Sequence, residues 1–379
     1  MLSNQRLRRS LTGVLTSVAA IVAALLVGAL VIKFAGSDPL KAYNGLLDGS
    51  IRSKRAIGET LVYGSPLILG GLAFAIAAKA GLFNIGIEGQ LVMGGFAAAL
   101  VGAWDLGLPA PLYLPLCIVA AIVAGGIWGM IPGFLRAKTG AHEVISTIML
   151  NYLAFRLITY LIQKGSSWLP VDPALQATKK VDPAARLPKI LDGTRVHAGI
   201  LIAVGCAILL WFILTKTTFG YKVRTVGLSR GAADYGGIKW GLTVTLAMTI
   251  SGALAGLAGA GESLGLQGRH LAAPPGYGYT AIAVGLVGQN NPIGILLSGL
   301  LFGMLSAGAS QMQAQADISK EIVAVLQGLI ILAVAATSVA GRLSFFQRFA
   351  KPPASGGDRS SEIGTEPEVE IPPKPSAVI

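Results

Sequence analysis

The stretch "GLFNIGIEGQLVMGG", residues 81–95, decides the fold. Most of its side chains are apolar, yet Asn84, Glu88 and Gln90 stand among them, with glycines at five positions. A carboxylate near the centre of a membrane helix costs roughly 2.5–3.5 kcal/mol on insertion scales. Asn84 and Glu88 are four residues apart, so on a helix they share one face. We therefore expect a membrane segment whose polar face turns towards other helices or a water-filled path. A structural glutamate satisfied by a neighbouring helix is the alternative for Glu88.

The composition of the whole chain supports a membrane location. Of its 379 residues 53% are hydrophobic and only 13% are charged, whereas soluble domains carry about 25% charged residues. The net charge of +12 is scattered over the connections between apolar runs, which is typical of membrane proteins and not of nucleic-acid binding. Both cysteines lie in apolar runs, and the three histidines lack metal-ligand spacing. The sequence thus predicts neither a metal site nor a cofactor.

Apolar runs of about 20 residues recur along the chain, each long enough to cross a hydrocarbon core of about 30 Å. The run at 278–289 is too short to cross alone, so it is interpreted as a half-helix or as a continuation of the loop before it. The fold class predicted is an all-α polytopic membrane protein with about ten transmembrane helices. The runs lie near residues 11–32, 60–78, 82–103, 112–132, 142–163, 198–214, 241–262, 278–289, 292–312 and 322–340.

The basic residues suggest an orientation. Three arginines within residues 6–9 precede the first run, and the positive-inside rule then favours a cytoplasmic start. With an even number of spans, both termini are expected to be cytoplasmic. Prolines make residues 164–197 an irregular outer loop. Residues 346–379 are predicted to form a disordered cytoplasmic tail, which leaves 1–345 as the transmembrane domain.

Small-residue spacing favours close helix packing. Several glycine pairs are four residues apart, the pattern that lets membrane helices approach closely, although some pairs arise by chance in a chain with 50 glycines. The pairs are Gly125 with Gly129, Gly129 with Gly133, Gly252 with Gly256, and Gly299 with Gly303.

Two other classes of function were weighed against a transport subunit. "GESLG", residues 261–265, matches a nucleophile elbow with His270 nearby, but it follows a membrane run instead of the strand that this motif requires. An ion-driven carrier would use Glu88, Glu143 and Glu262 as proton or ion sites. The chain also lacks the G-x-x-x-x-G-K-[ST] phosphate loop, so we do not expect it to hydrolyse ATP.

One connection, residues 215–241, is expected on the cytoplasmic side and is basic. Ser229 is a candidate N-cap for a short helix over 230–238. Small residues on that helix, including Ala232 and Ala233, would let another protein approach it. A solvated loop between two spans is the other interpretation.

Several stretches resemble the permease subunits of bacterial ABC importers in the branched-chain amino-acid and ribose permease superfamily, and within it the permeases for nucleosides and simple sugars. The similarity runs from about residue 60 to residue 340. It rests on "AGLFNIGIEGQLVMGGFAAALVG", "GAHEVISTIMLNYLA", "RTVGLSRGAADYGGI" and "IAVGLVGQNNPIGILLSGLLFGMLSAGA".

The resemblance implies a non-enzymatic subunit that forms the membrane pore of an importer and carries a nucleoside or simple sugar across the cytoplasmic membrane. It implies an ATPase on the cytoplasmic side, a second permease chain, related or identical, and an outer substrate-binding lipoprotein. Residues 224–238 would be the coupling segment to the ATPase, with Arg224, Gly227, Ala232, Ala233 and Gly237 matching the family pattern. A hydroxyl- and amide-rich solute must exchange its hydration for protein hydrogen bonds. The candidate pathway residues are Asn84, Glu88, Gln90 and Glu143.

Overall fold

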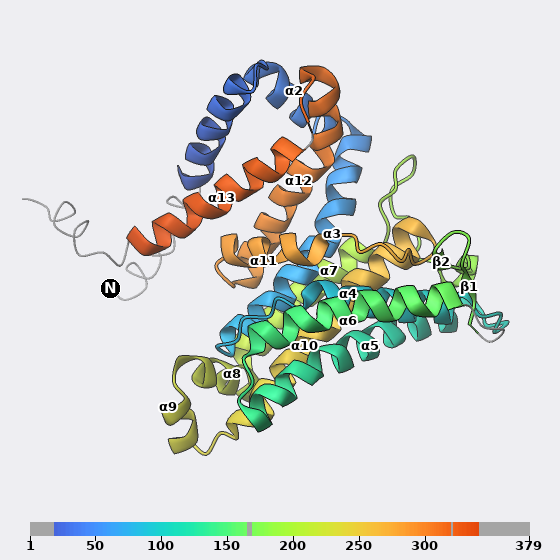
Figure 1. Cartoon of the computed structure of the whole chain (residues 1–379), viewed down its shortest axis with the longest axis vertical. Helices are drawn as coiled ribbons and strands as arrows, with labels where there is room; N and C mark the ends of the chain where they lie inside the picture. Colours follow the sequence, from blue (N-terminus) through green and yellow to red (C-terminus); the bar gives the residue numbers. More distant parts are fainter. Residues whose placement is uncertain (1–18, 165–168, 320, 341–379) are drawn as a thin grey trace, which may run out of the picture. The chain divides into compact units, whose positions relative to one another are not determined.

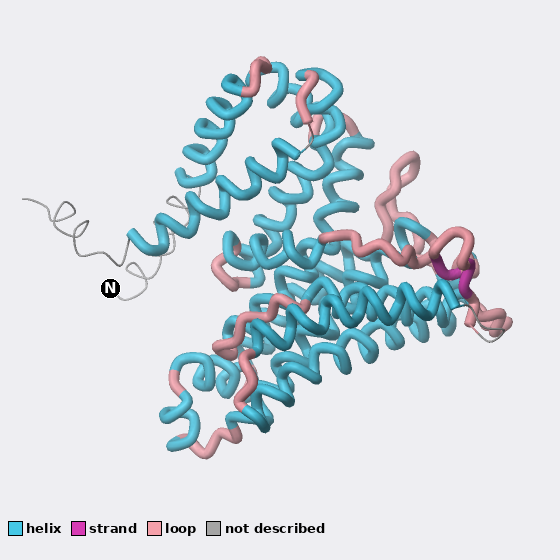
Figure 2. The backbone as a smooth tube through the Cα atoms, in the orientation of Figure 1, coloured by secondary structure: helices cyan, strands magenta, loops and turns pink. Residues whose placement is uncertain are grey.

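The computed structural model of the protein describes residues 19–164, 169–319 and 321–340, and most of this part of the chain is helical (Figure 2). The N-terminal arginines and the tail expected at 346–379 lie outside the described residues.

A helix over Ala19–Phe34 is followed by the elements labelled in Figure 1. They are α2 (Pro39–Ser50), α3 (Lys54–Lys79), α4 (Ile87–Ala103), α5 (Ala110–Thr139), α6 (Glu143–Lys164), β1 (Val171–Asp172), β2 (Ala177–Thr178), the 3₁₀ turn η1 (Pro183–Ala185), α7 (Gly199–Lys216), α8 (Thr218–Leu228), α9 (Arg230–Tyr235), α10 (Trp240–Ala260), the π-helix η2 (Gly261–Gln267), α11 (Tyr277–Val287), α12 (Pro292–Ala316) and α13 (Glu321–Ala340).

The expectation of about ten membrane-spanning helices is not supported. Among the described residues six helices are long and apolar enough to cross a membrane: α3, α5, α6, α7, α10 with η2, and α12. A seventh span results if Ala19–Phe34 and α2, which meet at a bend of 120°, count as one. The described apolar part of α13, Glu321–Val334, is shorter than a span, as are α4 and α11.

A break inside one apolar run explains part of the difference. The run expected at 82–103 is not helical at its start: Gly81 has φ +78° and the helix begins only at Ile87. The 17 residues of α4 therefore rise about 25 Å, and the 11 residues of α11 about 16 Å, at 1.5 Å per residue. The half-helix expected at 278–289 is confirmed as α11, whereas the break before α4 was not expected.

Helix α3 is the centre of the bundle. Of its most apolar 18 residues 83% are buried, against 28% for α5 and for α6 and 33% for α7. It packs against α10, α11, α12 and α7. The outward faces of α5, α6 and α7 expose large apolar side chains such as Val123, Met149 and Ile208. Apolar surface of this extent marks contact with lipid or another protein, so α3 forms the core and these three helices the rim.

Glycines bring the helices into backbone contact, as their spacing predicted. Gly125 and Gly129 of α5 lie against Gly252 and Gly256 of α10, with no room for a Cβ on any of the four. In the same way Gly303 of α12 lies against the backbone of α3 near Gly64. The close helix packing expected from the glycine spacing is therefore confirmed, and the structure shows it between α5 and α10 and between α12 and α3.

The long connection before α7 is not irregular throughout, because it contains a β-hairpin whose two strands are two residues long each. Strands β1 and β2 pair antiparallel, Val171 with Thr178. The chain after η2 returns to this hairpin: the backbone N–H of Thr178 donates to the His270 oxygen over 2.9 Å, and that of Ala272 donates to the Gln176 oxygen, also over 2.9 Å. The hairpin thus fixes the loop between η2 and α11.

Candidate functional site

A buried polar cluster fills the break before α4. Asn84, fully buried, accepts from the backbone N–H of Gly86 at 2.9 Å and donates to Gln90 Oε1 at 3.0 Å and to Ser251 Oγ at 2.8 Å. Ser251 in turn donates to the backbone oxygen of Ala73 on α3. The Gly86 N–H thus has a side-chain acceptor in place of a helical carbonyl, which satisfies this backbone donor of the break inside the bundle.

Glu88 joins the start of α4 to the start of α11. Its side chain is fully buried, and its two carboxylate oxygens accept from the backbone N–H groups of Gly276 (2.7 Å) and Gly278 (2.5 Å). These N–H groups lie at the N-terminus of α11, where the helix dipole favours a negative charge. Gly278 lies so close to the Glu88 backbone that a Cβ would not fit. Glu88 is therefore a cap supplied from another helix.

Helix α6 contributes a third side of the cluster. Asn151 accepts from the backbone N–H of Gly89 at 2.8 Å and donates to the backbone oxygen of Ile85 at 3.0 Å, and Thr147 lies against Gly86. Sequence reasoning did not select Asn151. Its signal was present, because Glu143, Thr147 and Asn151 recur every four residues on one face of an apolar helix.

Glu143 lies away from this cluster, two helical turns from Asn151. It is mostly buried and forms an ion pair with Arg136, whose Nε lies 3.4 Å from its carboxylate. Of the four pathway candidates, the structure thus brings Asn84, Glu88 and Gln90 together. Glu143 instead pairs with Arg136, which borders a cavity lined by residues of α8 and α9.

The geometry of this cluster suits a membrane transporter. Two helices shorter than a span begin next to each other inside the bundle, and an irregular backbone segment precedes each one. Discontinuous helices of this kind line solute sites in membrane transporters, because irregular backbone inside a membrane is tolerated only where protein buries it or where it borders a cavity.

A cavity of about 290 Å³ adjoins the loop before α11. Its wall includes Leu91 of α4 and Tyr277 of α11 together with polar residues of η2 and the loop after it. The polar residues are Glu262, Ser263, Gln267, Arg269 and His270. Ser263 Oγ lies 3.0 Å from His270 Nδ1. His270 lies in the connection beyond the α10–η2 span, and burial lowers its pKa to about 4, so its imidazole is neutral near pH 7.

The contact of Ser263 with His270 does not form a hydrolase site. Ser263 lies within the π-helix η2, which continues α10 without a break, and not on the strand–turn–helix elbow that exposes a nucleophilic serine. The other imidazole nitrogen, Nε2, has no hydrogen-bond partner among the described residues, so no carboxylate orients the ring as in a catalytic triad.

The expected short helix in the connection before α10 is confirmed as α9, which is shorter than the expected range 230–238. Ser229 caps it by accepting from the backbone N–H of Ala232 at 3.3 Å. Ala232 is exposed, whereas Ala233 is fully buried within the chain itself. Leu228 and Tyr235 are among the most exposed apolar side chains, 87% and 97% accessible. Leucine and tyrosine in this position favour an approaching protein over water.

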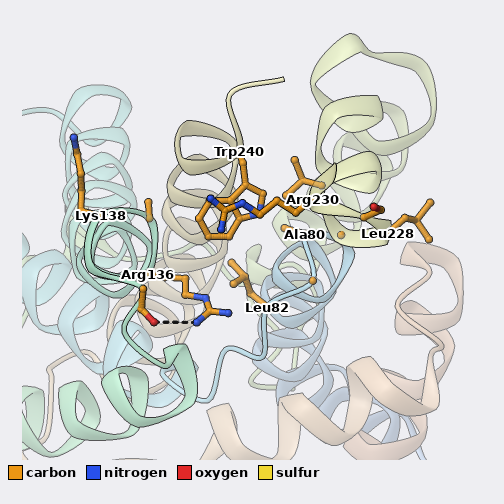
Figure 3. Close-up of a pocket in the computed structure, with 13 residues that line it drawn as sticks. Ala80, Leu82, Arg136, Lys138, Leu228, Arg230 and Trp240 are labelled. Atoms are coloured by element: carbon orange, nitrogen blue, oxygen red, sulfur yellow. Dashed lines mark hydrogen bonds between the residues drawn. The ribbon is translucent and has the colours of Figure 1, made fainter. Parts of the chain in front are cut away.

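A cavity of about 510 Å³ lies beside α9 (Figure 3). Arg230 lies over the Trp240 ring at 4.6 Å, and Arg136 donates to the backbone oxygen of Gly140 at 3.1 Å. Gly227, also on its wall, packs against the backbone oxygen of Lys79 at the end of α3, and a Cβ there would clash.

The two remaining residues of the expected coupling segment lie apart from this wall. Arg224 borders a smaller cavity of about 150 Å³ with Asn290 and Asn291. Gly237 has φ +69°, and a Cβ at this position would meet no atom within 4 Å. The residue therefore provides the left-handed backbone conformation of the turn after α9.

Comparison with known proteins matches residues 56–335 to a family described as "Branched-chain amino acid transport system / permease component". The chain is 38% identical to the guanosine ABC transporter permease protein NupP of Bacillus subtilis, over 87% of this chain and 95% of the relative. It is 37% identical to the nucleoside ABC transporter permease protein NupB of Lactococcus lactis, over 85% and 90%. It is also 37% identical to the glucose ABC transporter permease protein TsgB13 of Haloferax volcanii, over 84% and 86%.

Proposed function

The chain belongs to the permease component family of branched-chain amino acid transport systems, and as an ABC permease subunit it moves a solute while a partner hydrolyses ATP; we propose that its solute is a nucleoside. The observation that carries the proposal is the similarity to permeases named for guanosine and for nucleosides, which extends over most of both chains. The hydrogen-bonding side chains in the cavity beside η2 suit such a solute, because ribose hydroxyls and base amides need hydrogen-bonding partners.

A simple sugar is the second candidate. It is favoured by the similarity to a permease named for glucose, which is as great as that to one named for nucleosides. A hexose and a ribose present the same hydroxyl chemistry, so the cavity residues suit both.

The proposal includes an orientation and three partners. The end that carries α8 and α9 faces the cytoplasm, where exposed Leu228, Tyr235 and Ala232 receive the ATPase. The opposite end, with the β1–β2 hairpin, faces the outer lipoprotein. A second permease chain completes the pore. Basic Lys222, with Arg224 in the same connection, supports this orientation through the positive-inside rule.

The pathway residues act through the cluster at the break. We expect the solute to pass beside the starts of α4 and α11, and Asn84, Glu88 and Gln90 to keep these starts in place. Glu143, paired with Arg136 near the cytoplasmic end, would lie where the solute leaves.

The test is uptake by the reconstituted importer. The chain is co-expressed with its proposed ATPase, second permease and lipoprotein, and the purified complex is placed in proteoliposomes with ATP inside. We expect uptake of radiolabelled guanosine that unlabelled nucleosides suppress and glucose does not. An ATPase variant that binds but cannot hydrolyse ATP is the control. Glucose uptake without guanosine uptake would replace the nucleoside by a sugar, and uptake that persists with the inactive ATPase would reject an ATP-driven importer.

A further inference from the structure

The cavity beside η2 has polar groups that neither the break cluster nor the α8–α9 segment uses. Ser263 and His270 are buried, at 1% and 5% exposure, although they border a cavity of about 290 Å³. Glu262 accepts from Gln267 Nε2 at 3.1 Å on the same wall. A π-helix such as η2 is rare and frequently marks a functional site.

Contacts from three elements hold the wall that carries His270. The backbone N–H of His270 donates to Thr178 Oγ1 at 2.9 Å, and its oxygen accepts from the backbone N–H of Thr178. Its imidazole packs edge-on against Phe96, with ring centroids 5.8 Å apart. Ser263 holds Nδ1. Strand β2, α4 and η2 thus set the orientation of one side chain from three directions.

One atom of this arrangement is left without a partner. Nε2 of His270 is buried and forms no hydrogen bond with the described residues, and buried polar groups of native proteins are rarely left so. A neutral imidazole donates through one nitrogen and accepts through the other. A hydroxyl both donates and accepts, so it satisfies Nε2 in either tautomer.

We propose that this cavity is a binding subsite for a neutral polyhydroxylated ring, the ribose of the transported nucleoside, and that a small shift of the His270 ring brings its buried Nε2 to a ring hydroxyl. Ser263 positions the imidazole, and the Glu262–Gln267 pair offers further acceptors and donors. The size agrees, because about 290 Å³ lies at the low end of the roughly 300–1,000 Å³ typical of small-molecule sites. The identity of the ring as ribose rests on the proposed function.

The first experiment measures occupancy without transport. Ala273, exposed on the cavity wall, is replaced in Ala273→Cys, and a charged methanethiosulfonate labels the assembled importer without ATP. We expect saturating guanosine to slow labelling at least threefold. Ala174→Cys, at the exposed hairpin turn, is the matched control. Because the hairpin is proposed to face the lipoprotein, both variants are labelled without the lipoprotein, and Ala174→Cys should then label at the same rate with and without guanosine. The proposal would be overturned if Ala273→Cys were labelled at the same rate in guanosine, in glucose and in buffer alone.

The second experiment measures uptake per assembled importer. His270→Leu should lower guanosine uptake at least fivefold, and His270→Gln, which keeps a polar end, should lower it less. His197 is the matched control: it is also buried and packs against η2 at Gly265, but it does not border the cavity. His197→Leu should stay within twofold of wild type. Normal uptake by His270→Leu would reject the subsite.

The two failures are distinguishable. Absence of guanosine uptake by the wild-type importer counts against the nucleoside assignment, whereas wild-type uptake that His270→Leu leaves unchanged counts against the subsite alone. Protection of Ala273→Cys needs neither ATP nor transport. Should His270→Leu fail to assemble, the labelling rates decide.

Discussion

Replacing Glu88 tests whether two discontinuous helices depend on one carboxylate. Glu88→Leu leaves the N–H groups of Gly276 and Gly278 buried without an acceptor. A buried donor without a partner costs about 1–3 kcal/mol, so the two together cost about 2–6 kcal/mol. The leucine also removes the cost of burying a carboxylate, roughly 2.5–3.5 kcal/mol on insertion scales, so the expected net loss is at most about 3.5 kcal/mol. Glu88→Gln keeps one acceptor oxygen and should fall between leucine and wild type.

The assay is the thermal midpoint of the purified chain, followed by uptake. At about 2 °C per kcal/mol for a chain of this size, Glu88→Leu should melt below wild type by up to about 7 °C. Its uptake should be largely lost. Glu88→Gln should assemble and show altered uptake per assembled importer.

Glu59 provides the matched control. Its carboxylate accepts from Arg195 Nε at 2.9 Å outside the bundle interior, where such a pair contributes at most about 1 kcal/mol. Glu59→Gln should therefore shift the midpoint by no more than about 2 °C. A Glu88→Leu protein that melts and transports like wild type would refute the capping argument and any pathway role.

Three further predictions follow from the helix contacts. Ala232→Trp, on the exposed side of α9, should leave the thermal midpoint unchanged but reduce the amount of ATPase that co-purifies with the chain. Full co-purification together with normal uptake would show that α9 is not the coupling surface. Gly256→Val should separate α5 from α10 and lower the thermal midpoint by several degrees. Gly205→Val is the control, because a Cβ at this position meets no atom within 4 Å, and its midpoint should not fall. Equal midpoints of the two variants would contradict the packing of α5 on α10. In right-side-out vesicles an impermeant thiol reagent should label Ala174→Cys but not Tyr235→Cys, and the opposite result would invert the orientation.

Local signals in the sequence predicted much of the fold. Apolar runs located most of the helices, glycine spacing indicated that helices pack closely, and Ser229 marked the start of α9. These features depend on residues within a few positions of one another. The number of spans was wrong because hydropathy does not register that Asn84 satisfies the backbone of a non-helical segment, which shortens the helix that follows.

The site was less predictable because its contacts are remote in sequence. Glu88 binds backbone groups 188 and 190 residues away, and no side-chain type marks which N–H groups these are. The buried position of Ala233 depends in the same way on how α9 folds back. Ser263 and His270 are seven residues apart, and they meet only because the loop after η2 returns to strand β2.

These contacts form one continuous connection between the two ends of the chain's bundle. Gly227 of α8 packs on Lys79 and Gly81 at the end of α3, and the break that carries Asn84 follows directly. Glu88, at the start of the next helix, holds the start of α11, and the loop before α11 carries His270. Because the contacts at both Gly227 and Gly278 leave no room for a Cβ, a displacement of α8 cannot be absorbed there by side chains. We therefore expect ATPase movement at α8 and α9 to reach the solute cavity through the backbone of this segment, and a bulkier residue at Gly227 to uncouple ATP hydrolysis from uptake while guanosine still protects Ala273→Cys.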